Sequence, residues 1–214
     1  MRSTPVLVAF ILCPMWFGLA QDERPEPIVG LPCEGCEAVF EGIPRSIAAT
    51  ARIAPEREPG DEMVIEGSVV DASGTPAAGI VVYAYHTDAG GVYPKDEMLE
   101  GTPAYRHGRL RAWARTDSAG RYRFDTIRPG AYPSSRIPAH VHMHVIEPGR
   151  CTYFIASIEF EDDPRLSDED RKRHERGRGG SGLVSPERDQ NGRWRVRRDI
   201  VLGLRVPGYE DCGR

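Results

Sequence analysis

From residue 63 onward, short apolar runs alternate with turn residues, and this pattern limits the fold more than any other feature of the chain. Asp71-Ala-Ser-Gly74-Thr-Pro76 and Asp117-Ser-Ala-Gly120 are two of the turn segments. Regular short strands separated by Gly, Pro and Asp turns are typical of an antiparallel sandwich or barrel. We therefore expect an all-β fold with strands over residues 63–70, 80–85, 122–124, 141–146, 153–160 and 194–204. The last of these follows Asn191-Gly192, a strong hairpin signal.

The first 62 residues divide into two segments of different composition. Arg2 is followed by an apolar run over residues 6–17 and then by Gly18-Leu-Ala20. This pattern predicts a secretory signal peptide over residues 1–20, and hence a secreted or periplasmic protein with no membrane span after signal removal. The alternative is a short membrane anchor, although a span needs about 20 apolar residues. Residues 21–62 form a Pro-rich arm, and residues 63–214 form the expected sandwich domain.

Charge and cysteine content narrow the class of protein further. The formal net charge is −4, so no nucleic-acid partner is expected. Cys33, Cys36, Cys151 and Cys212 remain after signal removal, and an even count in an exported chain favours disulfides. A zinc site at Cys33-Glu-Gly-Cys36 would need a second pair at similar spacing, which the other two cysteines do not supply. The pairing is left open.

Residues 161–190 form a charged insertion before the last strand. Acidic and basic residues alternate in Asp168-Glu-Asp-Arg-Lys-Arg-His174, and a glycine-rich segment, residues 177–182, follows. Such alternation favours a solvated surface over a functional basic patch. We expect one helical turn that runs into a flexible loop.

Tyrosines and histidines are concentrated in two short segments. Tyr132, His140, His142 and His144 fall within thirteen residues, and Tyr93 lies upstream after Gly90-Gly91. In a strand, His140 and His142 share a face with Cα atoms about 6.5–7 Å apart, so both imidazoles reach one metal ion. His144 lies one step further along that face, and we expect it to pack or to support its neighbours. Phenolate and neutral imidazole both suit ferric iron.

Several motifs together resemble the intradiol ring-cleavage dioxygenases, and the cysteine-bearing arm resembles that family's secreted branch. The match runs over about residues 63–164 and the last strand. It is carried by Gly67-Ser-Val-Val-Asp71, Gly74-Thr-Pro76-Ala-Ala-Gly79, the segment ending at Tyr93, Arg115–Tyr132 and Pro138-Ala-His140-Val-His142.

The resemblance implies a transthyretin-like antiparallel β-sandwich with a non-haem Fe(III) ion. The ligands it implies are Tyr93, Tyr132, His140 and His142. It also implies cleavage of a catecholic ring with O2 to a muconate-type diacid. Tyr132 would act as the catalytic base that leaves the metal, with Tyr93 as the alternative. Family members often assemble, so a homo-oligomer is left open.

Two departures from the family pattern concern the substrate pocket. The family usually has an arginine three residues before the first ligand histidine, where this chain has Ile137. Arg136 is the candidate for that catalytic role, although a one-residue slip turns a side chain to the opposite face of an extended segment. The glutamine of the family's Thr-Gln pair is absent, since Ala156-Ser157 stands there. Arg111 is a further pocket candidate, with an ordinary surface position as the alternative.

Two alternative interpretations stay open. One is a catalytically silent β-sandwich binding module that keeps the fold and the metal. The other is a zinc or copper site that uses the histidines alone.

Overall fold

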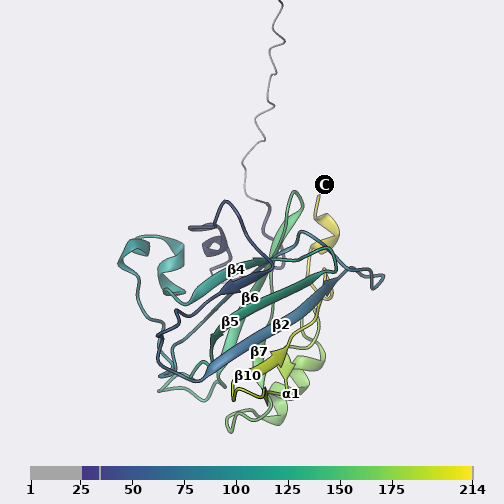
Figure 1. The fold of residues 1–214 in the computed structure, drawn as a ribbon. Coiled ribbons are helices and arrows are strands. Elements are labelled where there is room, and N and C mark those ends of the chain that lie inside the picture. Colours follow the sequence, from purple (N-terminus) through teal and green to yellow (C-terminus); the bar gives the residue numbers. More distant parts are fainter. Residues whose placement is uncertain (1–25, 34, 214) are drawn as a thin grey trace, which may run out of the picture.

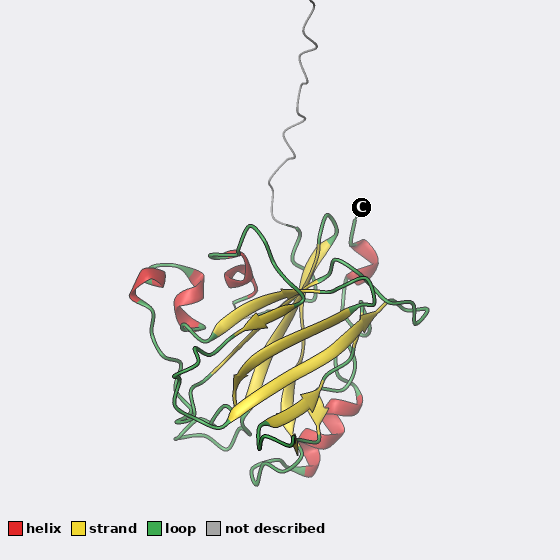
Figure 2. Ribbon diagram, in the orientation of Figure 1, coloured by secondary structure: helices red, strands yellow, loops and turns green. Residues whose placement is uncertain are grey.

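A computed structural model of the 214-residue chain describes residues 26–33 and 35–213. The expected signal peptide lies outside these residues. Within the described part of the chain, no helix has the length and apolarity needed to cross a bilayer. Strands dominate, and the helices lie at the periphery (Figure 2).

Two β-sheets make up the molecule, as Figure 1 shows. The first sheet has the order β1-β5-β2-β10-β9, with β11 also paired to β2. Its strands are β1 (Thr50–Arg52), β2 (Glu62–Val70), β5 (Arg121–Ile127), β9 (Glu187–Arg188), β10 (Trp194–Arg197) and β11 (Ile200–Val201). The second sheet has the order β4-β3-β6-β7-β8. Its strands are β3 (Val81–His86), β4 (Arg111–Arg115), β6 (His140–Glu147), β7 (Cys151–Phe160) and β8 (Leu183–Val184).

The predicted all-β sandwich is confirmed. The long central pairs, such as β2–β5 and β3–β6, are antiparallel. Short strands then extend the sheets in parallel: β1 on β5, β10 and β11 on β2, and β8 on β7. The helical elements are α1 (Asp168–Glu175) and the 3-10 helices η1 (Cys36–Phe40), η2 (Glu97–Leu99), η3 (Pro103–Arg106) and η4 (Tyr209–Asp211).

The second sheet is covered on both faces, and this places the functional side chains. Val82 and Ala84 of β3 enter the core between the sheets, whereas Tyr83 and Tyr85 point to the other face. That outer face packs against Val39 from the arm. On β6, alternation sends residues 141, 143 and 145 into the core. The histidines at positions 140, 142 and 144 therefore lie on the outer face, beneath the arm.

The expected strand over residues 194–204 is interrupted, because Arg198 turns inward. This side chain is 1% exposed, and its guanidinium donates to backbone carbonyls of five residues. The bonds to Gly179 and Gly180 hold the glycine-rich end of the insertion against β7. The expectation of a flexible loop there is wrong. A Cβ at Gly182 would lie 1.9 Å from the Ser157 carbonyl oxygen, so the backbones are in direct contact.

The insertion also contains more helix than the single expected turn. Helix α1 spans eight residues and begins at a capping box, in which Ser167 and Asp170 bond each other's backbone N–H groups. Its first turn is acidic and its last turn basic, which complements the helix dipole. The sequence also gave no separate signal for β4.

All four cysteines of the predicted disulfide set are paired. Cys33 is joined to Cys36, and Cys151 is joined to Cys212. The second bond ties the start of β7 to the C-terminal segment after η4. The first closes a short ring in the arm, above the outer face of the second sheet.

Candidate metal centre

Four side chains from separate parts of the sequence meet at one point. The phenol oxygens of Tyr93 and Tyr132 lie 2.7 Å apart. The Tyr132 oxygen lies 3.2 Å from Nε2 of His140, and that nitrogen lies 3.1 Å from Nε2 of His142. Ligand atoms bound about 2.1 Å from one ion, at right angles to each other, would be about 3 Å apart. Each of these three neighbouring pairs therefore has the spacing expected of two ligand atoms on one ion.

The two tyrosine turns meet because glycines allow their backbones to touch. A Cβ at Gly91 would lie 2.1 Å from the carbonyl oxygen of Ala131, and one at Gly130 would lie 2.4 Å from that of Ala89. The Gly130 N–H donates to the Asp88 carbonyl. Any larger residue at either glycine would separate the turns, and with them the two phenols.

Strand β6 supplies the imidazoles in a fixed orientation. Nδ1 of His140 donates to the carbonyl of Pro138 at 2.8 Å, so its Nε2 carries a free lone pair toward the centre. Asp163 accepts the Ala139 N–H at 2.7 Å, and Arg165 donates to the Tyr132 carbonyl at 2.8 Å. The segment after β7 thereby holds both Tyr132 and the start of β6.

The protonation states of these groups suit a strongly charged cation. Burial, followed by the neighbouring His140, lowers the pKa of His142 well below its ordinary value near 6.5. The imidazole is therefore neutral and able to bind metal. Burial and the hydrogen bond with Tyr132 raise the pKa of Tyr93 far above its usual range. Only a nearby cation of high charge would draw the proton from this phenol, and two phenols with two imidazoles form a donor set that fits Fe(III).

His144 does not join the four donors. It is 3% exposed, and its Nε2 lies 3.9 Å from Sγ of Cys33. Together with Cys36 these residues place three ligand atoms within 4.8 Å of one another. The two sulfurs are bonded to each other, however, so neither is a thiolate ligand. The predicted packing role of His144 agrees with its stacking beside Tyr85.

A cavity of about 700 Å³ opens from the donor atoms along the outer face of the second sheet. Tyr93, Tyr132 and His142 line one part of it. Tyr85 stacks between His142 and His107, at centroid distances of 4.6 and 3.6 Å, and forms an aromatic wall. Residues of the arm and of the charged insertion close the remaining sides.

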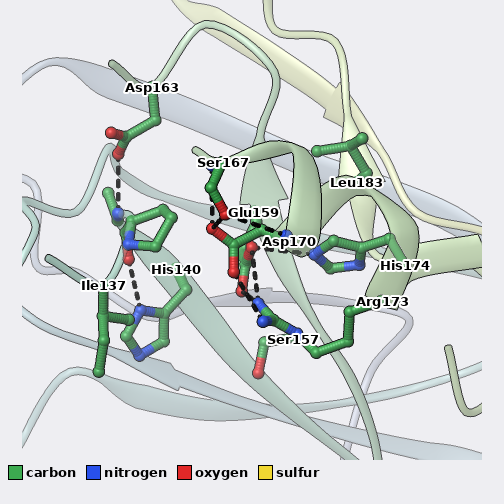
Figure 3. A network of polar contacts seen from close by, with 12 residues as sticks. Ile137, His140, Ser157, Glu159, Asp163, Ser167, Asp170, Arg173, His174 and Leu183 are labelled. Atoms are coloured by element: carbon green, nitrogen blue, oxygen red, sulfur yellow. Dashed lines mark hydrogen bonds and ion pairs between the residues drawn. The ribbon is translucent and has the colours of Figure 1, made fainter. Parts of the chain in front are cut away.

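The insertion contributes a buried polar cluster to this cavity, shown in Figure 3. Glu159 of β7 lies opposite His140 in the strand register and is 6% exposed. Arg173 of α1 donates to both of its carboxylate oxygens, at 2.9 and 3.3 Å, and to Asp170 at 2.6 Å. Nε2 of His174 lies 3.0 Å from the same carboxylate. Most of α1 is exposed, as predicted for a solvated segment, and His174 is the residue of the helix that is buried.

Arg136, the predicted catalytic arginine, is exposed and does not line the cavity. Ile137, which takes the position of the family's arginine, is also exposed and does not line the cavity, so this whole segment stays outside it. Arg111 lies on β4, where its guanidinium stacks on Trp113 at 5.1 Å. Neither side chain lines the cavity.

The cavity wall includes residues that the sequence did not single out: Tyr85, His107, Phe154, Glu159, Arg173 and Arg178. Four of them, Tyr85, His107, Phe154 and Glu159, lie on strands or in a turn, where the sequence indicates only packing. Arg173 and Arg178 belong to a segment with an ordinary surface composition. Contacts with other segments of the chain hold both arginines at the cavity, Arg173 on Glu159 and Arg178 on the Gly30 carbonyl, and no local sequence motif predicts these contacts.

Comparison with known proteins gives consistent matches. A family described as "Dioxygenase" matches residues 43–178. The protocatechuate 3,4-dioxygenase beta chain of Burkholderia cepacia is 29% identical over 113 residues, which are 50% of this chain and 48% of that protein. Chlorocatechol 1,2-dioxygenase of Rhodococcus opacus is 30% identical over 135 residues, with 51% and 47% covered. The chain thus spans about half the length of these relatives.

Solved structures agree in fold. The dioxygenase domain of a dioxygenase–carbohydrate-binding protein fusion from Streptomyces sp. SirexAA-E superposes with a TM-score of 0.57 at 20% identity, covering 85% of this chain and 99% of that domain. Hydroxyquinol 1,2-dioxygenase of Pseudomonas putida DLL-E4 gives a TM-score of 0.55 at 23% identity, with 85% and 68% covered. At these identities the likeness shows the fold alone. The family match, however, extends over more than half of the residues, and the chain therefore belongs to the intradiol ring-cleavage dioxygenase family.

Proposed function

We propose that this protein is a non-haem Fe(III)-dependent intradiol dioxygenase that opens a catecholic ring with O2 to give a muconate-type diacid. The observation that carries the proposal is the convergence of two phenol oxygens and two imidazole nitrogens within 3.2 Å of their neighbours. Ferric iron held there would activate a chelated catechol toward O2, the chemistry that the phenolate ligands favour by keeping the metal oxidised.

The chain's own residues would bind and orient the substrate and take its protons. We assign the role of the base that leaves the metal to Tyr132, whose oxygen lies between that of Tyr93 and Nε2 of His140. Tyr85 offers an aromatic face beside His142, against which a substrate ring can pack.

Metal content and colour test the proposal. Purified protein loaded with iron should absorb visible light by phenolate-to-iron charge transfer, and the band should shift when a catechol is added. Tyr93→Phe and Tyr132→Phe should each weaken or abolish the band, whereas Tyr105→Phe, outside the cavity, should leave it unchanged. A colourless iron-loaded protein would refute the site. Unchanged metal content in both cavity variants would instead indicate a zinc or copper site built from the histidines.

A metal-binding module without turnover is the second candidate. The observation that favours it is the exposed position of Arg136, which leaves the cavity without the arginine usual in the family. Oxygen uptake with a panel of catechols separates the two candidates. Uptake with stoichiometric ring opening supports the enzyme, and a coloured protein that consumes no oxygen supports the silent module.

We also propose that the protein is exported. The support is the pair of disulfides, because such bonds persist in oxidising compartments. Mass spectrometry of the protein secreted by its own host should find Gln21 at the N-terminus. A mature chain that still begins at Met1 would refute cleavage.

A further inference from the structure

The cavity is larger than an unsubstituted catechol needs. Its volume is about 700 Å³, whereas a cavity of about 150 Å³ accommodates a benzene ring. The space continues past the donor atoms along β6 and β7. It therefore has room for a substituent on the substrate ring, and the side chains along that path indicate which kind.

The strand register locates the far end of this space. Phe154 of β7 lies opposite His144 of β6, and it lines the cavity. His144 lies two residues beyond His142 and four beyond His140. At about 3.3 Å per residue, the Phe154 end is about 7 Å from the level of His142 and about 13 Å from that of His140. A ring held at the donor atoms would need a short chain of atoms to reach it.

Two guanidinium groups without a carboxylate partner line this cavity. Arg178 is half-buried and stacks on Phe154 at 4.0 Å from the ring centroid. It donates through Nη1 to the Gly30 carbonyl at 2.7 Å, and it forms no ion pair within residues 26–33 and 35–213. Arg176 is exposed and likewise forms no ion pair within those ranges. Arg173, in contrast, is neutralised by Glu159 and Asp170.

The environment of Arg178 makes an anion the matching ligand. This guanidinium is half-buried, and its burial lowers its pKa. Its Nη1 bond to Gly30 and its stacking on Phe154 fix the plane of the group. A planar guanidinium held in this way pairs well with a carboxylate, and an anion here would compensate the buried charge.

We infer that Arg178 and Arg176 form a carboxylate subsite, and that the substrate is a catechol with an acid group at the end of a short aliphatic arm. The inference rests on the proposed function for the position of the ring. The carboxylate lies at the Phe154 end, with Arg178 as its principal partner and Arg176 as a second, solvent-exposed one.

Affinity for two ligands of equal length tests the subsite. Binding of 3-(3,4-dihydroxyphenyl)propanoate and of 4-propylcatechol is followed by protein fluorescence, anaerobically, on the iron-loaded protein. The acid should bind about tenfold more tightly, because only it gains a charge-assisted hydrogen bond. Arg178→Gln should remove most of this preference and leave the Kd of 4-propylcatechol within about twofold of its original value. Arg178→Lys should restore part of the preference.

Arg176→Gln provides a second test that does not depend on the packing of Arg178. It changes an exposed side chain and should reduce the preference for the acid about two- to fivefold, as for a surface ion pair. Lys172→Gln removes one charge from the exposed side of α1, away from the cavity, and should leave the preference unchanged. The subsite is refuted if the acid and 4-propylcatechol bind equally well, or if neither arginine variant changes their ratio.

The subsite and the proposed function fail in different ways. The same titrations on iron-free protein report the acid preference without any turnover. A protein that prefers the acid but cleaves no catechol would overturn the dioxygenase proposal alone. A protein that cleaves both ligands with equal kcat/KM and binds them equally would overturn the subsite alone.

Discussion

Substitution of Arg198 by methionine should destabilise the protein and disorder one wall of the cavity. Methionine fills a similar volume but donates no hydrogen bond. The guanidinium of Arg198 is 1% exposed, and it donates to five backbone carbonyls, three of which belong to the segment from Arg178 to Gly180. These bonds set the position of the backbone that carries Arg178 into the cavity.

The magnitude follows from the carbonyls that lose their donor. Two of the five, those of Arg178 and Gly179, also accept a backbone N–H, so we count only the other three. At about 1–1.5 kcal/mol each, their loss amounts to about 3–4.5 kcal/mol. Release of a buried charge offsets part of this loss, which leaves about 3 kcal/mol. For a domain of this size that corresponds to a decrease in Tm of roughly 6–12 °C.

Equilibrium unfolding in urea, with the disulfides intact and the same metal state throughout, measures the effect. Arg197→Met is the matched control, because Arg197 is 62% exposed and pairs with Asp199 at the surface. Its loss should cost about 0.5 kcal/mol or less. If Arg198→Met unfolds within about 1 kcal/mol of the parent, the carbonyls do not depend on the guanidinium, and our account of the insertion is incorrect.

Three further effects should be measurable. Burial lowers the pKa of His86 to about 4, so below about pH 6.5 the unfolded chain binds a proton at this residue that the folded protein does not bind. The free energy of unfolding should therefore fall as the pH drops from about 6.5 toward 4, and it should fall less steeply in His86→Gln. Equal slopes in the two proteins would refute this. Removal of the Cys151–Cys212 bond, with a sequence separation of 61, should cost about 4 kcal/mol in urea unfolding. Removal of Cys33–Cys36, with a separation of 3, should cost about 1.5 kcal/mol, and a reversed order would contradict the chain-entropy account. Iron, assayed after desalting, should be lost on acidification as the ligand histidines take up protons, and retention well below their titration range would argue against histidine ligands.

The sequence by itself predicted the sheet content, and its resemblance to a known family picked out four side chains that lie next to one another in the structure. Strand alternation placed His140 and His142 on one face, and the glycines before Tyr93 and Tyr132 marked turns. These features are local. The alternation of side chains along a strand and the conformational freedom of glycine depend on neighbouring residues, not on which distant segment packs against them. For the same reason the strand predicted over residues 194–204 was too long. No residue near Arg198 in the sequence indicates that its side chain turns inward and interrupts the strand.

Only the tertiary structure decided what surrounds the donors. Arg136 looked like the pocket arginine by its position in the sequence, yet the fold exposes it, while Arg178, from a segment of ordinary surface composition, lines the cavity. The Cys151–Cys212 bond and the ion pair between Glu159 and Arg173 likewise join different segments of the chain. The physical reason is that charge and hydrogen-bond partners are chosen by proximity in space, and a local sequence pattern carries no information about which distant segment will arrive there.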